Sequence, residues 1–459
     1  MNGHVLDPRI LRAYDIRGVF GLTLSADDAR AIGRAFGSRI RDEGGATVCV
    51  GYDGRLSSPE LEAAVADGLR MCGLEVFRIG RGPTPMLSYS VFEYGAGAGV
   101  MVTGSHNPPD HNGFKLMLGE RPFFGRDIVA LGETVEAGDY TDGAGSIRER
   151  PAFDDYVSRL VRDVEAPSDI VAAWDAGNGA TGEVLTALTA RLPGRHILLH
   201  EVIDGLFPAH HPDPTVAENL ADLQAAVRTE GCDIGFAFDG DGDRIGVIDS
   251  LERILWGDQL LAILARDVLA AHPGATIIAD VKASDMLFDE VAALGGKPLI
   301  WCAGHSLIKS KMAETGAPLA GEMSGHVFFA DDYYGFDDAL YAGLRLLRVL
   351  ARSGESLASL FDSLPVTVNT PEIRIPCDDD RKFGVIEDVR ARLRAADARI
   401  IEVDGVRVRT GDGWWLLRAS NTEGALVVRC ESSDAAGLSR LKDAVTAELR
   451  QCGIEPPGF

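Results

Sequence analysis

The chain has 459 residues, enough for about two to four domains of ordinary size. Apolar residues make up 46% and charged residues 25% of it, which excludes a largely disordered chain, a fibrous repeat and a disulfide-stapled miniprotein. The 69 acidic and 45 basic residues leave a formal charge of −24, which disfavours binding to nucleic acid or to anionic membranes. An anionic ligand would therefore need a local concentration of cations.

Neither a secretory signal nor a membrane span is expected from the sequence. The first ten residues, MNGHVLDPRI, lack a charged start followed by an apolar run. The most apolar helical stretch, residues 260–271, contains Arg266 and Asp267 and is too short to cross a bilayer. The seven cysteines form no C-x-x-C pair and are expected to be free thiols in a reducing compartment. We therefore expect a cytoplasmic protein.

Helix and strand signals alternate through most of the chain. Short apolar segments at 47–53, 169–175 and 276–280 predict strands, and each of them ends in an aspartate. Ser58 followed by Pro59 predicts the N-cap and first residue of a helix that runs to about residue 71. This alternation predicts doubly wound α/β layers with mainly parallel sheets.

A weak internal repeat is present in the same segments. Beyond each aspartate, a second strand leads into a polar, glycine-rich loop, and these loops are residues 102–113, 238–244 and 321–326. This predicts three similar α/β domains, each with a loop at the carboxyl end of a strand, where open α/β sheets bind ligands. Chance similarity among common α/β segments is the alternative interpretation.

The segment after Pro365 has a different pattern. Close-set strands and a final helix predict an α+β domain with antiparallel strands. The chain is therefore expected to fold into four domains, with the boundaries 1–150, 151–253, 254–366 and 367–459.

The loop FDGDGDR predicts a metal site. Asp239, Asp241 and Asp243 alternate with glycines directly after the predicted strand IGFAF, so three carboxylates can face one point. An EF-hand is excluded because its sixth and twelfth positions are Arg244 and Ser250. Three carboxylates with few other ligands favour Mg²⁺, and a solvated acidic turn is the alternative.

The loop TGSHNPPDHNGFK presents Ser105 just after a predicted strand. A serine hydroxyl there could act as a nucleophile, with His106 and Lys115 nearby, but serines and histidines in turns are more often only turn formers. The nucleophile-elbow pattern G-x-S-x-G is absent, which disfavours a serine hydrolase.

Two further loops match a sugar and a phosphate. GEMSGH places Glu322, Ser324 and His326 at alternating positions, where a carboxylate could accept two hydroxyl hydrogens of a sugar. RASNTEG offers the donors that a phosphate requires, from Arg418, Ser420, Asn421 and Thr422. Ordinary polar turns are the alternative at both places.

Taken together, these loops resemble those of the α-D-phosphohexomutase superfamily, and most closely the bacterial phosphomannomutase/phosphoglucomutase group. The resemblance runs from Leu11 to the final helix and includes the segments AYDIRG, TGSHNPPDHNGFK, FDGDGDR, AGHSLIK, GEMSGH and RASNTE. It implies four domains that meet at a central cleft. GEMSGH points to the mannose/glucose group rather than to phosphoglucosamine mutase, which stays an alternative.

The resemblance also implies a mechanism. Ser105 would carry a phosphoryl group and, with the three aspartates, would hold one Mg²⁺ per chain, while Arg244 steadies the phosphate. The phosphoserine would donate to a hexose phosphate, giving a hexose 1,6-bisphosphate that turns end over end and returns its other phosphate to Ser105. The net reaction interconverts hexose 1-phosphate and hexose 6-phosphate.

The remaining site residues follow from the same resemblance. Lys115 is the expected general acid/base, with a lowered pKa, and Arg17 and His305 are its alternatives. The substrate-binding residues are expected to be Tyr14, Arg17, Lys282, His305, Glu322, Ser324, His326, Arg418, Ser420, Asn421 and Thr422. We expect a monomer that binds small sugar phosphates and neither nucleic acid nor membranes. A phosphoserine-dependent sugar phosphatase and an inactive sugar-phosphate binder are the alternatives of other classes.

Overall fold

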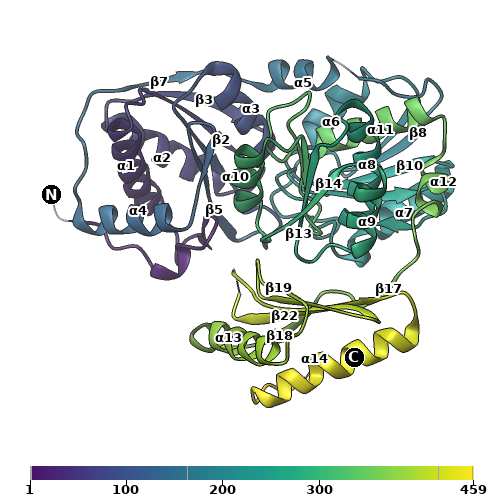
Figure 1. Cartoon of the computed structure of the whole chain (residues 1–459). Helices are drawn as coiled ribbons and strands as arrows, with labels where there is room; N and C mark the ends of the chain where they lie inside the picture. The colour runs from purple at the N-terminus through teal and green to yellow at the C-terminus, as the bar shows by residue number, and fades with distance from the viewer. Residues whose placement is uncertain (1–2, 163, 422, 457, 459) are drawn as a thin grey trace.

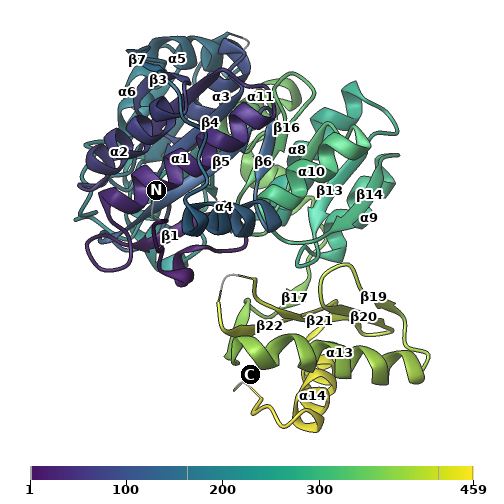
Figure 2. The same ribbon diagram turned by 90° about the vertical axis from the view of Figure 1, so that its left-hand side faces the viewer.

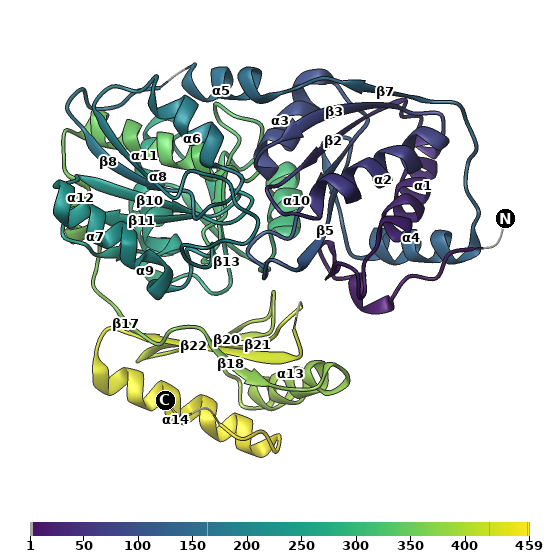
Figure 3. The same ribbon diagram turned by 180° about the vertical axis from the view of Figure 1, so that it is seen from behind.

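The computed structural model describes residues 3–162, 164–421, 423–456 and 458. Three α/β domains follow one another along the chain, and the C-terminal domain lies beside them (Figure 1). Views from the side and from behind show the same separation of the C-terminal domain (Figures 2 and 3).

The first sheet has the strand order β1-β5-β4-β2-β3-β7, with β6 paired to β5. Its strands are β1 (Ile16–Val19), β2 (Thr47–Tyr52), β3 (Glu75–Arg81), β4 (Ala98–Val102), β5 (His111–Leu118), β6 (Arg121–Phe123) and β7 (Ser146–Glu149). The helices of this part are η1 (Pro8–Ile10), α1 (Ala26–Asp42), α2 (Ser58–Met71), α3 (Thr84–Tyr94) and α4 (Arg126–Ala137).

The second sheet has the order β12-β11-β10-β8-β9. Its strands are β8 (Val171–Asp175), β9 (Arg195–Leu199), β10 (Ile234–Phe238), β11 (Ile245–Asp249) and β12 (Ile254–Leu255), and its helices are α5 (Phe153–Val161), α6 (Gly182–Thr189), η2 (Ala217–Leu220) and α7 (Ala221–Glu230). Strand β12 pairs with β11 and so belongs to the second sheet.

The third sheet has the order β14-β13-β15-β16. Its strands are β13 (Thr276–Asp280), β14 (Lys297–Trp301), β15 (Leu319–Gly321) and β16 (Val327–Phe329). Its helices are α8 (Gly257–Ala271), α9 (Asp285–Ala293), α10 (His305–Thr315), α11 (Ala339–Ser353) and α12 (Leu357–Asp362).

The C-terminal sheet is antiparallel, as predicted for an α+β domain. Its order is β17-β22-β21-β20-β19, with β18 also paired to β22. Its strands are β17 (Val368–Asn369), β18 (Ile373–Pro376), β19 (Ile400–Ile401), β20 (Val406–Thr410), β21 (Gly413–Ala419) and β22 (Ala425–Ser432). The helices α13 (Asp379–Ala395) and α14 (Ala435–Gln451) cover the face turned away from the other domains (Figure 1).

The predicted internal repeat is confirmed by the sheet topology. The segments β5-β4-β2-β3, β11-β10-β8-β9 and β16-β15-β13-β14 have the same order and the same strand directions. The sheets are more mixed than we expected, because one edge strand of each segment is antiparallel. The glycine-rich loops return the chain directly beside the strand that it has just left, and so short a connection makes an antiparallel pair.

The aspartate that ends the central strand of each repeat fixes the following turn. One carboxylate oxygen accepts a hydrogen bond from the backbone N–H two residues later, in the pairs Asp53–Arg55 (3.0 Å), Asp175–Gly177 (2.9 Å) and Asp280–Lys282 (2.9 Å). In the first and third repeats the other oxygen accepts from the glycine-rich loop of the next strand, at Gly104 N and Met323 N (both 3.2 Å). The aspartates therefore hold the loops in place.

The helix predicted after Ser58 is present, but its N-cap is Ser57. Ser58 is the first residue of the helix, and its hydroxyl donates to Asp53 Oδ1 at 2.5 Å. In the third domain the apolar stretch 260–271 lies within α8, whose inner face is buried. No helix among the described residues is long and apolar enough to cross a membrane. All seven cysteines are free thiols.

The second repeat contains a histidine with a shifted pKa. His210 Nε2 lies 3.0 Å from Asp175 Oδ2, and this hydrogen bond raises the pKa of His210. A raised pKa in the folded protein stabilises it at low pH. The contribution is complete below the ordinary histidine pKa of about 6.5 and is lost as the pH rises through the raised value.

We expect His210→Gln to lower the midpoint of thermal unfolding most below about pH 6.5, where the charged pair is fully formed. The difference in unfolding midpoint between wild type and variant should become smaller as the pH rises. His200→Gln, which removes the more exposed contact with Asp222, is the matched control. If the difference in unfolding midpoint is the same from acid to alkaline pH, the charged His210–Asp175 pair is not the cause of the destabilisation.

Candidate active site

All four domains line one cleft of about 710 Å³, a size typical of small-molecule sites. The residues predicted from the sequence converge on it: Tyr14, Arg17, Ser105, Lys115, Arg244, Lys282, His305, Glu322, Ser324, His326, Arg418, Ser420 and Asn421 all line its wall. Thr422 lies outside the described residues. The glycine-rich loops of the three repeats and the loop after β21 therefore open into the same space.

The cleft is locally cationic in an acidic chain. Among the described residues, eight lysines and arginines but only five aspartates and glutamates line it, whereas the whole chain carries −24. Three of these cations, Arg12, Arg374 and Arg429, were not predicted from the sequence, because none lies in one of the recognised loops. The wall can therefore attract an anion that the rest of the surface repels.

Ser105 lies at the end of β4 with its backbone in the left-handed region (φ 50°). Its side chain is buried, and Oγ donates to Asp239 Oδ2 at 2.9 Å and lies 3.1 Å from His106 Nδ1. The Ser105 N–H donates to Thr103 Oγ1 at 2.8 Å. A residue with a Cβ rarely adopts this backbone conformation, so the loop must be held by other contacts.

Arg55 supplies those contacts, and sequence reasoning missed it. This fully buried arginine, from the turn after β2, donates to the carbonyl oxygens of four residues of the Ser105 loop: Ser105, Asn107, Pro108 and His111. A Cβ on Gly104 would lie 2.6 Å from the Arg55 guanidinium, so only glycine permits this approach. Burial lowers the pKa of Arg55, and Asp53, 3.2 Å away, opposes the shift. The pattern Asp-Gly-Arg directly after a strand was the available signal.

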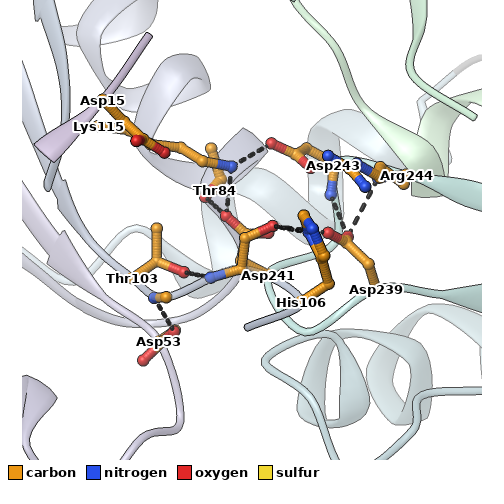
Figure 4. A network of polar contacts seen from close by, with 12 residues as sticks. Asp15, Asp53, Thr84, Thr103, His106, Lys115, Asp239, Asp241, Asp243 and Arg244 are labelled. Atoms are coloured by element: carbon orange, nitrogen blue, oxygen red, sulfur yellow. Dashed lines mark hydrogen bonds and ion pairs between the residues drawn. The ribbon is translucent and has the colours of Figure 1, made fainter. Parts of the chain in front are cut away.

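The three predicted metal ligands lie close together (Figure 4). Asp239, Asp241 and Asp243 are fully buried, and their ligand atoms lie within 4.8 Å of one another. Oδ1 of Asp241 and Oδ1 of Asp243 are buried without a hydrogen-bond partner, and such orphaned acceptors are costly unless a cation contacts them. The site therefore fits a small divalent cation.

The protein compensates only part of this negative charge. Lys115 Nζ donates to Asp241 Oδ2 at 2.7 Å and also to Asp243, and Asp239 Oδ1 accepts from Asp243 N and Arg244 N, both at 3.1 Å. Burial and the two neighbouring carboxylates raise the pKa of Asp239 well above its usual range. Burial acts on Asp241 in the same direction, but Lys115 holds the pKa of Asp241 below its ordinary value.

The expected lowering of the Lys115 pKa is wrong for the geometry seen here. Burial alone would lower the pKa of Lys115, but Asp241, Asp243 and Asp239 outweigh burial and raise it. Lys115 is therefore held as an ammonium ion. Arg17, its proposed alternative, donates from Nη1 to Asn107 Oδ1 at 2.7 Å and from Nη2 to Asp15.

Two stacked histidines form the next part of the wall. The rings of His305 and His326 are 5.3 Å apart and inclined by 24°. Arg244 Nε donates to His326 Nε2 at 3.0 Å, and His326 Nδ1 lies 3.0 Å from Asp337 Oδ2. Burial holds the pKa of His305 well below its usual range. His305 is therefore a neutral imidazole at neutral pH.

The predicted sugar loop and Lys282 both line the cleft. Glu322 Oε1 accepts from Gly304 N at 2.6 Å, and burial raises the pKa of Glu322. Lys282 Nζ lies 3.1 Å from Glu372 Oε2. Although burial opposes it, Lys282 and Arg374 lower the pKa of Glu372 to about 2. Glu372 is a further cleft residue that the sequence motifs did not indicate.

The predicted phosphate loop contacts the other domains. Arg418 Nε donates to Asp404 Oδ2 at 3.0 Å, and the same oxygen accepts from Ala303 N at 3.1 Å. Tyr14 OH donates to the carbonyl oxygen of Ala303 at 3.0 Å and accepts from Asn421 Nδ2 at 2.7 Å. Side chains of the first and C-terminal domains thus meet at the edge of the third.

We expect Arg55→Met to destabilise the protein by about 3–5 kcal/mol, because the substitution leaves Asp53 and several carbonyls buried without their cation. Catalytic activity should fall with it, since the Ser105 loop loses its anchor. Denaturant unfolding and turnover measure the two effects. Arg39→Met removes an exposed pair with Glu43 and should change stability by less than about 1 kcal/mol. Equal effects of the two variants would contradict the anchoring role.

Known proteins share the whole of this architecture. The chain matches the phosphoglucomutase/phosphomannomutase models for alpha/beta/alpha domains I (residues 8–132), II (154–252) and III (256–368), and for the C-terminal domain (372–448). A phosphomannomutase/phosphoglucomutase of Pseudomonas aeruginosa is 44% identical over 97% of this chain and 96% of its own. A phosphoglucomutase of Neisseria gonorrhoeae is 42% identical, over 96% of each chain.

The fold agrees with these sequence matches. A crystal structure of a phosphoglucomutase/phosphomannomutase family protein from Burkholderia thailandensis has a TM-score of 0.93 and 43% identity, and covers 99% of this chain and 100% of its own. Sequence, domain order and fold therefore agree, and the chain belongs to the phosphoglucomutase/phosphomannomutase family of isomerases.

Proposed function

We propose that this phosphohexomutase moves a phosphoryl group between the C1 and C6 oxygens of mannose and glucose phosphates through a phosphoserine at Ser105. The observation that carries the proposal is the place of Ser105 Oγ, at the wall of a cationic cleft and 2.9 Å from one of three buried carboxylates. The names of the relatives, which include both mannose and glucose, support the substrate class.

Asp239, Asp241, Asp243 and the phosphorylated Ser105 would hold one Mg²⁺. When bound, the ion would offset the phosphate charge and make the phosphorus more electrophilic. The two orphaned Oδ1 atoms and the alternating glycines support this assignment. A Cβ on Gly240 would lie 2.4 Å from the carbonyl oxygen of Ser105, so glycine is needed where the two loops touch. Arg244, beside the same aspartates, is proposed to bind the phosphate.

The transfer step breaks the bond between phosphorus and Ser105 Oγ and forms one between phosphorus and the free hydroxyl oxygen of the sugar phosphate. The proton of that hydroxyl must leave. Lys115 stays our first proposal for the general acid/base, and its raised pKa suits the acid role. His305, as a neutral imidazole, can accept the hydroxyl proton. Arg17 is more suited to binding, since a guanidinium is not deprotonated in proteins.

The reverse step needs the hexose 1,6-bisphosphate to turn within the cleft. Its distal phosphate would bind at the loop after β21, and the sugar at the GEMSGH loop, with Tyr14 and Lys282 between them. The proposed distal-phosphate residues are Arg418, Ser420, Asn421 and Thr422, and the proposed sugar-binding residues are Glu322, Ser324 and His326. The cations around the cleft support retention of the doubly charged intermediate. We further propose that the enzyme works as a monomer in the cytoplasm.

We expect Ser105→Ala to lower kcat by at least about a thousandfold while the affinity for glucose 1-phosphate is retained, because only the nucleophile is lost. Turnover and calorimetric titration measure the two quantities. Ser310→Ala, which removes a hydroxyl bonded within α10, is the matched control. Intact-mass spectrometry should detect one phosphoryl group on the active wild type and none on the Ser105 variant. Full turnover by Ser105→Ala would contradict the mechanism.

A trace of glucose 1,6-bisphosphate separates a mutase from a phosphatase. It should raise the rate of isomerisation without raising the release of inorganic phosphate, because the bisphosphate phosphorylates Ser105 but is not hydrolysed. Phosphate release that rises in step with the bisphosphate would instead indicate a phosphoserine-dependent phosphatase.

We expect Asp241→Asn to weaken Mg²⁺ binding by at least about tenfold, because it removes a charged ligand from the proposed site. Titration of metal-free protein with MgCl₂, followed by calorimetry, measures this directly. Asp222→Asn on α7 removes an exposed carboxylate outside the site and should leave Mg²⁺ affinity unchanged. Unaltered Mg²⁺ binding by Asp241→Asn would refute the assignment of the metal site.

A further inference from the structure

Two buried arginines of the C-terminal domain hold the turn that presents Lys282 to the cleft. The Lys282 turn comprises residues 281–284, between β13 and α9. Arg407 on β20 donates from Nη1 to the carbonyl oxygens of Val281 and Ala283, both at 2.7 Å. Arg429 on β22 donates from Nη1 to the carbonyl oxygen between them, that of Lys282. Three consecutive carbonyls of the third domain are thus bonded to the C-terminal domain.

The burial of Arg407 is energetically unfavourable. Its side chain is fully buried, with the guanidinium 3.7 Å from the centre of the Trp414 ring and Nη2 2.6 Å from Asp285 Oδ1. Burial lowers the pKa of Arg407 to about 10, against the opposing effect of Asp285, so it is still charged at neutral pH. A buried ion pair rarely stabilises a protein more than well-packed apolar residues would. Arg407 does not line the cleft, and its bonds all lead to the Lys282 turn or to Asp285.

The end of the Lys282 turn is held from the same side. Glu431 Oε1 on β22 accepts from Ser284 Oγ at 2.9 Å and from Asp285 N at 3.0 Å, at the start of α9. Trp414 Nε1 donates to the same oxygen at 2.9 Å. The carboxylate therefore fixes the first residues of the helix relative to β21 and β22.

The Lys282 side chain also contacts the C-terminal domain. Its Nζ lies 3.1 Å from Glu372 Oε2 and 3.7 Å from Asp280 Oδ2, the aspartate that ends β13. Both the backbone and the ammonium group of Lys282 are therefore bonded to the domain that carries Arg418. Within its own domain the turn is held by hydrogen bonds from Lys282 N to Asp280 Oδ1 (2.9 Å), from Ala283 N to the Asp280 carbonyl oxygen (3.1 Å) and from Ser284 N to Asp258 Oδ2 (2.9 Å).

We propose that Arg407 is a positioning residue that fixes the Lys282 ammonium relative to the phosphate loop at Arg418. Through it, the Lys282 turn is bonded to the C-terminal domain as well as to its own domain, and the contacts between the two domains fix where the ammonium group lies. A sugar phosphate would then meet Lys282 and Arg418 as one preformed pair of cations. This inference rests on the proposed function, in which Lys282 and Arg418 both bind the substrate.

A double-mutant cycle tests the proposal. Arg407→Met keeps the bulk of the side chain but removes its donors, and Lys282→Ala removes the ammonium group. We expect each to weaken binding of glucose 1-phosphate to the full-length protein by about tenfold, the usual effect of losing a hydrogen bond to a charged group. The double variant should bind no more weakly than Lys282→Ala alone, because Arg407 acts only through Lys282. Calorimetric titration gives all the affinities.

Arg409→Met is the matched control. Arg409 lies on the same strand and contacts the same Asp285 Oδ1 at 2.7 Å, but it donates to no carbonyl of the Lys282 turn in the described structure. We expect its glucose 1-phosphate affinity to equal that of wild type. A loss as large as that of Arg407→Met would assign the effect to Asp285 and overturn the proposal.

The remaining outcomes separate this inference from the proposed function. Multiplicative losses in the double variant would show that Arg407 and Lys282 act independently, and would overturn the inference while the proposed function stands. If Lys282→Ala binds glucose 1-phosphate as tightly as wild type does, Lys282 is not part of the substrate-binding site. That result would overturn the inference, whatever the Ser105 variant shows. If Arg407→Met does not fold, Arg407→Lys keeps the charge and one donor, and the same non-additivity with Lys282→Ala is required of it.

Discussion

The active site depends on holding like charges together away from water. Asp239, Asp241 and Asp243 are fully buried within a few ångströms of one another, and burial and mutual repulsion together raise the pKa of Asp239. Lys115 and the backbone N–H groups of the loop compensate only part of this charge. The remaining imbalance explains why a divalent cation fits there. Only with such a cation bound would the proposed phosphoryl group on Ser105 be offset in charge.

A repeated arrangement brings the necessary loops to one place. In each of the three α/β domains a central strand ends in an aspartate, and in the first and third domains that aspartate bonds both its own turn and the loop of the neighbouring strand. The loops differ in chemistry, since one carries Ser105, one carries the carboxylates and one carries Glu322. A single backbone layout has therefore been used three times, and the side chains of the loops distinguish the three copies.

Much of this could be predicted from the sequence, and the remainder has physical causes. The loops carry dense local patterns, so Ser105, the aspartates and the repeat were all predicted. Ser105 lines the cleft, and the aspartates are buried beside it. Arg55 was missed because the loop carbonyls that it bonds lie at least 50 residues further along the chain, and Arg374 and Arg429 were missed because neither lies in a recognised loop. The N-cap was misplaced by one residue because Ser57 and Ser58 are adjacent serines, and the sequence alone does not show at which of them the helix begins. The pKa of Lys115 was expected to fall because of its proposed role as general acid/base, and its direct bonds to Asp241 and Asp243 raise that pKa instead.

The contacts of the C-terminal domain with the others differ greatly in how easily they separate. Tyr14 and Asn421 are part-buried and meet through a single hydroxyl oxygen, so water can replace the lost bond on either side at little free-energy cost. The Arg407 side chain is fully buried, and water could reach its carbonyl partners only if Trp414 also became exposed to solvent. Separation of the C-terminal domain would therefore cost less free energy at the Tyr14–Asn421 contact than at Arg407.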